Sequence, residues 1–246
     1  MRKRDLLLAT TGVIAAWQLA SMVIDRPVLP PPWAVLRAFW ASLPQELGKH
    51  LLVSAWRVIA SIALATAFAL PAGLGLGLSK TANRLAEPII YLLYPIPKVV
   101  FLPIILLLLG IGNLSKVFVI SLILFFQMLV VVRDEAAKLR PELVASVRSL
   151  GAGRRALFRY VYLPACLPAV LTSLRVSIGT AIAVLFFAES FATTSGLGYY
   201  IIVETWGRLD YAGMYAGVVA MSLLGLALYF AVDTAQRRMC PWLAAS

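Results

Sequence analysis

Long apolar runs separated by short polar segments dominate the hydropathy pattern of this 246-residue chain. A helix needs about 20 residues to cross the hydrocarbon core of a bilayer, and several uncharged runs reach that length. The pattern predicts six transmembrane helices, at residues 6–24, 51–79, 88–110, 116–132, 163–189 and 211–233. A transmembrane barrel would instead show short alternating segments. The predicted fold class is therefore an all-α, polytopic membrane protein.

Three prolines interrupt the third apolar run, at Pro95, Pro97 and Pro103. Each proline removes a backbone donor and disturbs the carbonyl of the preceding helical turn. Unpaired backbone groups at membrane depth are tolerated only where protein or a water-filled cavity covers them. We therefore expect this run to face the protein interior or a transport pathway.

Polar side chains also fall inside the predicted spans: Lys98 lies among the prolines, Gln127 and Arg175 lie near mid-depth, and Glu189 lies toward the outer end of its helix. Charges at the bilayer centre are costly and usually mark pathways or buried pairs. The pattern suggests an anionic solute. The predicted translocation path comprises Pro95, Pro97, Lys98, Pro103, Gln127, Arg175 and Glu189. Alternatively, Lys98 snorkels to the interface and Arg175 pairs with a carbonyl or carboxylate.

Composition agrees with a membrane protein, because 61% of the residues are hydrophobic and only 13% are charged, about half the usual charged share of soluble domains. Placing both termini in the cytoplasm puts most lysines and arginines inside, as the positive-inside rule requires. Those left outside are Arg26, Arg37, Lys49, Lys116 and Arg208. The net charge of +11 then needs no nucleic acid, since anionic lipid and an inner-face partner suffice.

The chain offers little chemistry of its own, and we assign no catalytic residue and no metal ligand. The glycine-rich segment Gly73–Lys80 lacks the spacing of a phosphate loop and fits close helix packing better. The single histidine, His50, is interpreted as an interfacial residue at the outer end of the second span. Cys166 and Cys240 fall near the cytoplasmic face, where thiols stay reduced.

A basic, glycine-containing polar segment separates the fourth and fifth predicted spans, at residues 133–162. It is longer than the roughly 2 to 8 residues that usually connect helices. We expect two short helices that meet at Gly151, because glycine adopts a positive φ without a Cβ clash. The first would end at Leu150, and the second would start after Gly153 and run toward Pro164.

This segment carries the spacing of a known motif. The run Ala145-Ser-Val-Arg-Ser-Leu-Gly151, followed after residues 152–160 by Val161-Tyr-Leu-Pro164, resembles the EAA loop of ATP-binding-cassette (ABC) importer permeases. Further similarity to the nitrate, sulfonate and taurine branch of that family lies in HLLVSAWRV, YPIPKVVFLPIILLLLGIGNLSK, AESFATTSGLGYYI and RRMCPW. The resemblance covers roughly residues 25 to 242.

The resemblance implies a type I importer permease fold, with one permease domain over residues 1–246 and a core at about 51–235. It implies alternating-access import of a small, anionic sulfonate-, taurine- or nitrate-like solute across a bacterial or archaeal cytoplasmic membrane. The expected partners are a second permease subunit, identical or related, two ATPase subunits, an external solute-binding protein near Ser195–Ile201, and lipid. ATP and magnesium would bind the ATPases, so we expect no cofactor on this chain.

Residues 133–162 would form the cytoplasmic coupling loop that docks on the ATPase. By resemblance, the coupling residues are Glu142, Ala145, Arg148, Ser149, Leu150, Gly151, Ala152, Arg154, Arg155, Leu163 and Pro164. The glutamate that names the motif is replaced by Ala145, and Glu142 is a partial substitute.

Two other classes stay open. A secondary active transporter would explain the spans and the mid-membrane charges, although such proteins often contain internal repeats. An integral membrane enzyme would need clustered histidine, aspartate or glutamate near the interface, and the acids are scattered along this sequence.

Overall fold

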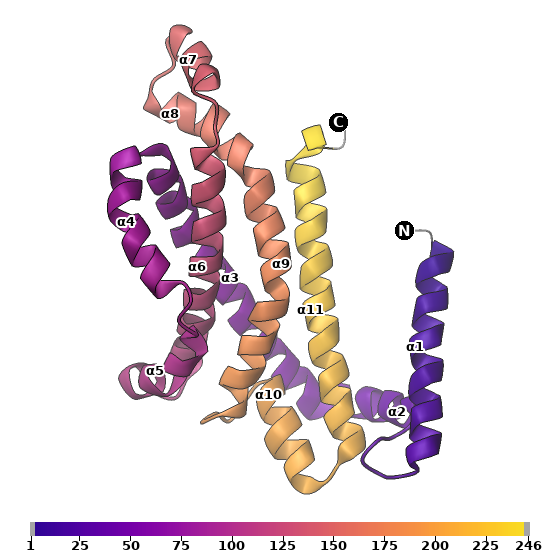
Figure 1. Ribbon diagram of the computed structural model, residues 1–246. Coiled ribbons are helices and arrows are strands. Elements are labelled where there is room, and N and C mark those ends of the chain that lie inside the picture. Colours follow the sequence, from indigo (N-terminus) through magenta and orange to yellow (C-terminus); the bar gives the residue numbers. More distant parts are fainter. Residues whose placement is uncertain (1–2, 244–246) are drawn as a thin grey trace. The chain divides into compact units, whose positions relative to one another are not determined.

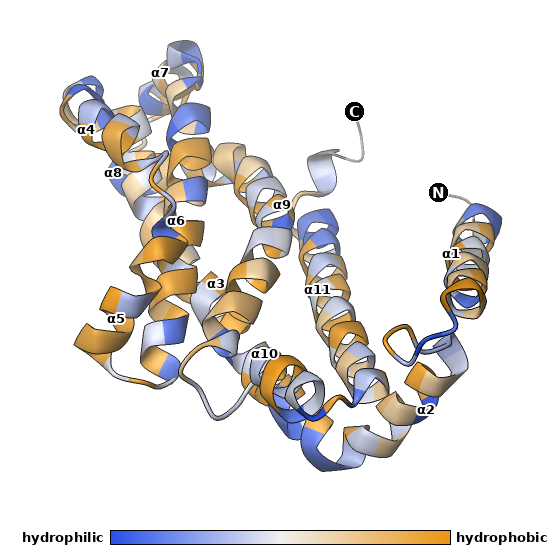
Figure 2. Ribbon diagram, turned by 60° about the horizontal axis from the view of Figure 1, so that its bottom comes forward, coloured by the Kyte–Doolittle hydropathy of each residue, from blue (hydrophilic) through white to orange (hydrophobic). Residues whose placement is uncertain are grey.

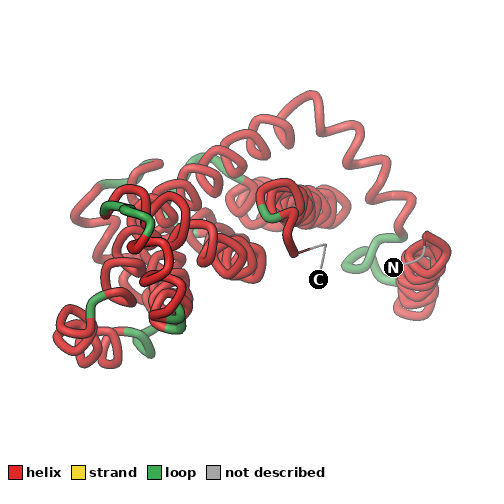
Figure 3. Tube along the Cα trace, turned by 90° about the horizontal axis from the view of Figure 1, so that it is seen from above, coloured by secondary structure: helices red, strands yellow, loops and turns green. Residues whose placement is uncertain are grey.

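The computed structural model describes residues 3–243, and every regular element in this range is a helix (Figures 1 and 3). Short π-helical turns join α2 to α3 and α8 to α9, so these pairs form long, nearly continuous helical runs. The all-α prediction is confirmed. The helices are α1 (Lys3–Ile24), α2 (Pro32–Ser42), α3 (Gly48–Leu78), α4 (Lys80–Leu93), α5 (Leu102–Leu109), α6 (Asn113–Ala137), α7 (Pro141–Ser149), α8 (Arg154–Leu157), α9 (Leu163–Ser190), α10 (Leu197–Tyr199) and α11 (Tyr211–Met239).

Four helical runs are long and apolar enough to cross a membrane, namely Pro32–Leu78, Asn113–Ala137, Arg154–Ser190 and Tyr211–Met239. They correspond to the predicted spans 51–79, 116–132, 163–189 and 211–233, of which the first ends one residue earlier, at Leu78. The apolar part of α1, Leu8–Ile24, is shorter than these four. The predicted total of six spans therefore stays a prediction.

The predicted third span, residues 88–110, is wrong as a single helix. The chain forms α4 and a second helical stretch, Lys98–Leu109, which are bent by 76° relative to each other. The break falls at Pro95 and Pro97, neither of which has an amide hydrogen to continue a helical hydrogen-bond ladder. This bent pair is a fifth candidate span or a re-entrant loop.

The chain divides into two compact units, each built from two stretches of sequence. The larger unit comprises Trp56–Ala188 and Gly225–Ser246. Within it, glycines of α3 lie against α6: a Cβ atom on Gly73 would come within 2.7 Å of the Val132 side chain, and one on Gly77 would meet the Ala136 Cβ at 2.6 Å. These glycines allow the close helix approach that is typical of membrane interfaces.

Figure 1 shows that the α7–α8 region and the C-terminal end of α11 lie at the same end of this larger unit. Figure 2 shows hydrophilic residues on α7 and at that end of α11, and hydrophobic residues along the middle of α6. The last turn of α11 carries Arg237 and Arg238. This end of the unit therefore has the polarity of a water-facing surface.

The smaller unit comprises Met1–Ala55 and Glu189–Leu224. Its helices pack through aromatic and small residues: the Trp17 and Tyr215 rings lie 5.8 Å apart, and Gly217 lies against Tyr200 and Ile201. The indole nitrogen of Trp17 also donates to a backbone carbonyl in the loop after α1. Buried tryptophans usually find such a partner.

Candidate functional site

The polar segment after α6 folds as two short helices joined by a glycine turn. The turn is a Schellman motif, in which the Gly151 amide donates to the Arg148 carbonyl at 2.9 Å and the Ala152 amide donates to the Val147 carbonyl at 3.4 Å. Gly151 has φ +84°, a conformation that strains any residue with a side chain. The predicted helix–turn–helix geometry is confirmed, with α7 ending at Ser149 instead of Leu150. We call residues 141–157 the α7–α8 hairpin.

The first arm of this hairpin turns apolar and charged side chains to the outside. No residue of α7 is buried, and Leu150 beside the turn is 85% exposed. Glu142 lies in the first turn of α7 and Arg148 in the last, where each charge is stabilised by the helix dipole. With Leu143, which is 48% exposed, Leu150 gives this polar hairpin apolar side chains that face outward.

The second arm is anchored in the protein. Leu157 and Val161 are buried, and the helix continues through a π-helical turn into α9 without a break. The predicted second short helix and the predicted span at residues 163–189 therefore form one continuous helical run, Arg154–Ser190. Of the predicted coupling residues, Ala152, Leu163 and Pro164 are half-buried, whereas the exposed ones are Glu142, Ala145, Arg148, Ser149, Leu150, Gly151, Arg154 and Arg155.

The break between α4 and α5 is held by a lysine. The Lys98 Nζ donates to the carbonyls of Leu93 at 2.9 Å and Tyr94 at 2.7 Å, which belong to the last turn of α4 and its C-cap. The same ammonium lies 4.6 Å from the centre of the Phe126 ring. Carbonyls at a helix C-terminus and an aromatic face both attract a cation. Lys98 therefore caps α4 where the prolines end it.

A cavity of about 340 Å³ lies beside this break. Its walls include four of the predicted path residues, Pro95, Pro97, Lys98 and Gln127, together with side chains from α6 and α9. The Gln127 Oε1 atom is buried and has no hydrogen-bond partner within the described residues. The structure thus brings together residues that lie some thirty positions apart in the sequence.

The other predicted path residues are not in the wall of this cavity. Arg175 forms an ion pair with Asp233 at 2.7 Å, and Arg237 also bonds that carboxylate, at 2.9 Å. Arg175 therefore pairs with a carboxylate, the alternative to a place on the path. Pro103 lies in the first turn of α5, where a proline needs no hydrogen-bond partner.

Glu189 belongs to a different site. The three consecutive amides of Gly196–Gly198 donate, in order, to His50 Nδ1 at 2.9 Å, Ser54 Oγ at 2.7 Å and Glu189 Oε2 at 3.1 Å. The Ser54 hydroxyl in turn donates to the same Glu189 oxygen at 2.7 Å. These amides open α10, where helical N–H groups have no acceptor within the helix. We call Gly196–Gly198 with its three capping side chains the capped turn.

The capping residues His50 and Ser54 were missed as functional candidates. A signal existed, because His50, Ser54, Arg57 and Ser61 recur at the i, i+4, i+7 and i+11 positions of one helix face, and all four are buried. Such a polar stripe predicts a face turned toward protein instead of lipid. It does not identify the partners, which lie more than 130 residues away for the capped turn.

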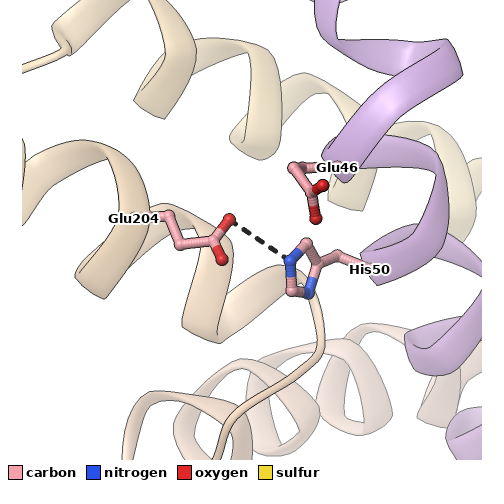
Figure 4. Close-up of side chains that lie close together, drawn as sticks. All are labelled: Glu46, His50 and Glu204. Carbon is pink, nitrogen blue, oxygen red and sulfur yellow. Dashed lines mark ion pairs between the residues drawn. The ribbon is translucent and has the colours of Figure 1, made fainter.

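Figure 4 shows His50 between two carboxylates, Glu46 and Glu204, with ligand atoms of the three residues within 4.8 Å of one another. Because the Gly196 amide donates to Nδ1, the proton of a neutral imidazole lies on Nε2, which is 3.2 Å from the Glu204 carboxylate. A metal ion at Nε2 would displace that proton and leave an anionic ring. The geometry favours a hydrogen-bonded histidine over a metal ligand.

This cluster corrects two interpretations of the sequence. His50 is 6% exposed, so it is a buried positioning residue and not an interfacial one. Acids that are scattered along the sequence do meet a histidine here, because the fold brings the segment after α10 against the start of α3 within the smaller unit.

Comparison with known proteins identifies the family. Residues 65–243 match the family described as binding-protein-dependent transport system inner membrane component. The taurine transport system permease protein TauC of Escherichia coli (strain K12) is 31% identical, over 98% of this chain and 90% of its own length. The putative aliphatic sulfonates transport permease protein SsuC of the same strain is 30% identical, over 94% of this chain and 89% of its own length.

A solved structure supports the same fold. The MetNI methionine ABC transporter, in an inward-facing conformation, contains a chain that superposes with a TM-score of 0.64 and 20% identity, covering 78% of this chain and 95% of that chain. At this identity the match supports the fold alone, whereas the four long apolar helices and the family match make this a multi-pass membrane protein of a transport system. The chain belongs to the family of inner membrane components of binding-protein-dependent transport systems.

Proposed function

We propose that this chain is the permease subunit of an ABC importer that moves a small sulfonate- or taurine-like solute into the cytoplasm. The substrate class is supported by the names of the relatives TauC and SsuC, each similar over almost the whole chain. The membrane is the cytoplasmic membrane of a bacterium or archaeon.

The α7–α8 hairpin is the observation that carries this proposal. Its first arm offers exposed apolar and basic side chains to a partner, and its turn is held in one shape by Gly151. Its second arm is continuous with α9. A displacement of the hairpin by an ATPase subunit would therefore be passed directly to a membrane-crossing helix as a rigid-body movement.

The cavity beside the break between α4 and α5 is our candidate for part of the solute path. Lys98 and Gln127 in its wall are polar groups within apolar sequence. Inserting such groups into a membrane costs free energy, and they usually mark a transport pathway or a buried pair. Arg175 and Glu189 have partners elsewhere. We therefore narrow the predicted path to the proline, lysine and glutamine residues of this cavity.

The partners follow from this function. A second permease subunit, identical or related, completes the membrane part, two ATPase subunits bind ATP and magnesium, and an external binding protein delivers the solute. We place the binding protein against the segment that begins at Ser195, since its turn is already fixed by His50, Ser54 and Glu189.

Reconstitution of the complex into proteoliposomes tests the function. We expect uptake of labelled taurine or ethanesulfonate only when ATP and the binding protein are both present, and ATPase activity that rises when the binding protein carries its ligand. Uptake that continues without the ATPase subunits would indicate a secondary transporter instead. Catalytic turnover by the purified chain alone would indicate an enzyme.

A further inference from the structure

The two ring nitrogens of His50 have opposite hydrogen-bonding roles. Nδ1 accepts from the Gly196 amide at 2.9 Å, and Nε2 lies 3.2 Å from the Glu204 carboxylate, to which it donates when the ring is neutral. Both nitrogens of a protonated histidine are donors. A proton added at Nδ1 would therefore face the N–H group of Gly196, and the hydrogen bond between them would be lost.

Charged and aromatic groups surround this ring within the smaller unit. The Glu46 and Glu204 carboxylates approach it from two different segments (Figure 4), and Glu46 also pairs with the exposed Lys49 at 3.0 Å. On the side of α10, the ring centres of Tyr199 and Tyr200 lie 5.8 and 5.7 Å away. A buried charge needs a partner of opposite sign. The two carboxylates supply that partner, so this cluster has a place for an imidazolium ion.

The other two bonds of the capped turn use acceptors that this proton does not change. The Leu197 amide donates to Ser54 Oγ at 2.7 Å, and the Gly198 amide donates to Glu189 Oε2 at 3.1 Å. Ser54 links these acceptors, since its hydroxyl donates to the same Glu189 oxygen. Loss of the His50 acceptor would therefore free the first amide of the turn and leave the next two held.

We propose that His50 is a pH switch for the capped turn: protonation of Nδ1 releases the Gly196 amide and frees the start of the segment on which the binding protein docks. Histidine side chains change charge between about pH 5 and 8, so the switch acts within a physiological range. The docking step rests on the proposed function, which places the external binding protein against this segment. The opening of the turn rests on the geometry of the cluster alone.

Hydrogen exchange at the three amides of the capped turn tests the switch in the purified permease–ATPase complex, without the binding protein and without transport. His50→Asn is the matched variant, because asparagine carries an acceptor oxygen on its γ carbon, as histidine carries Nδ1, and gains no proton in this range. The carboxylates Glu46, Glu189 and Glu204 are present in both proteins. Comparison of the two proteins at each pH therefore isolates the histidine and cancels the pH dependence of the exchange chemistry.

At pH 8 the Gly196 amide should exchange at similar rates in the parent and in His50→Asn. At pH 5.5 it should exchange roughly tenfold faster in the parent, the effect of losing about one hydrogen bond. The Leu197 and Gly198 amides should exchange at similar rates in both proteins at either pH. Equal Gly196 rates at pH 5.5, or an equal acceleration of all three amides in the parent, would overturn the proposal.

His50→Gln supplies a reference for the open turn. Its side-chain amide lies one carbon further from the backbone, toward the position of Nε2, and so does not replace the Nδ1 acceptor. We expect fast Gly196 exchange in this variant at both pH values, with the parent resembling it only at pH 5.5. This comparison also decides the matter if His50→Asn does not assemble, because an unchanged ratio of parent to His50→Gln rates between pH 8 and 5.5 would overturn the switch.

The regulatory consequence is measured as the stimulation of ATPase activity by the loaded binding protein, relative to basal activity at the same pH. We expect this stimulation to fall several-fold from pH 8 to pH 5.5 in the parent and to fall less in His50→Asn. An equal fall in both proteins would overturn the regulation of docking by His50.

The outcomes also separate this inference from the proposed function. If the reconstituted complex takes up sulfonates but Gly196 exchanges equally in the parent and His50→Asn at pH 5.5, the switch is wrong and the importer stands. If Gly196 exchange follows the expected pattern while no sulfonate is taken up with ATP and binding protein present, the proposed function is wrong and the opening of the turn stands.

Discussion

The α7–α8 hairpin and the capped turn both bend at a glycine with a positive φ, yet they are held in opposite ways. Gly151 has φ +84° and Gly196 has φ +114°. A Cβ atom on Gly151 would meet nothing within 4 Å, whereas one on Gly196 would overlap the Glu189 carboxylate. The hairpin needs glycine for its backbone conformation alone, and the capped turn needs it for space as well.

The two turns also differ in which groups satisfy their backbone hydrogen bonds. Buried side chains satisfy the amides of the capped turn, and two of them, His50 and Ser54, lie 146 and 143 residues away in the sequence. The hairpin satisfies its own carbonyls through local bonds and leaves Leu150 exposed. The capped turn is stabilised by contacts within the fold. The hairpin instead leaves an exposed surface to which a partner protein can bind.

The largest expected effect is that of Gly196→Ala. The added methyl group collides with Glu189 and the backbone becomes strained, so we expect a loss of at least about 3 kcal/mol in stability from backbone strain and overpacking. Thermal unfolding in detergent should show a clearly lower midpoint. Gly207→Ala is the matched control, since its Cβ would lie at an ordinary 3.4 Å from the nearest atom, the Ile202 carbonyl oxygen. Equal midpoints for the two variants would contradict the account of the capped turn.

Ser54→Ala should come next. It removes both the acceptor for the Leu197 amide and a donor to Glu189, and a buried group left unpaired costs about 1–3 kcal/mol. The same thermal measurement applies. Ser222→Ala serves as control, because that exposed hydroxyl bonds only to a carbonyl of its own helix. If the two serine variants unfold at the same temperature, the Ser54 bonds do not stabilise the turn.

Gly151→Ala should have a smaller effect on stability and a visible effect on coupling. The strain of about 1 kcal/mol falls in a hairpin whose first arm has no buried residue, so the unfolding midpoint should stay nearly unchanged. ATPase stimulation by the loaded binding protein should fall several-fold, because the hairpin no longer holds the docked shape. Gly153→Ala, at φ −77° and with open space around it, should behave as the parent. Normal stimulation in Gly151→Ala would argue against a coupling role.

The smallest effect is expected for Ala145→Glu, which restores the acid typical of the resembled motif on an exposed position of α7. An exposed ion pair contributes about 0.2–1 kcal/mol, so stimulated ATPase activity should change by no more than a few-fold. Ala145→Gln adds similar bulk without charge and should leave the activity at the parental level. If both variants shift the activity equally, size and not charge matters at this position.

Local features of this molecule could be predicted from the sequence, and distant pairings could not. The Gly151 turn depends on residues within a few positions of one another, so its glycine and flanking helices are visible in the sequence. Prolines predict that the third apolar run is disturbed, but the 76° bend also depends on Lys98 and the carbonyls that it caps. Helical periodicity shows that His50 and Ser54 share a face. It contains no information on Glu189 or Gly196, which reach them only through the fold.

The glycine contact between α3 and α6 has a consequence for the membrane itself. Because the α3 backbone lies directly against Val132 at Gly73 and against Ala136 at Gly77, neither water nor a hydrated ion has room to pass between the two helices there. A cell that maintains an electrical potential across its membrane needs such a wall to stay sealed while other helices of a transporter move. We therefore expect that substituting bulky residues for Gly73 and Gly77 would first cause ions to leak across the membrane.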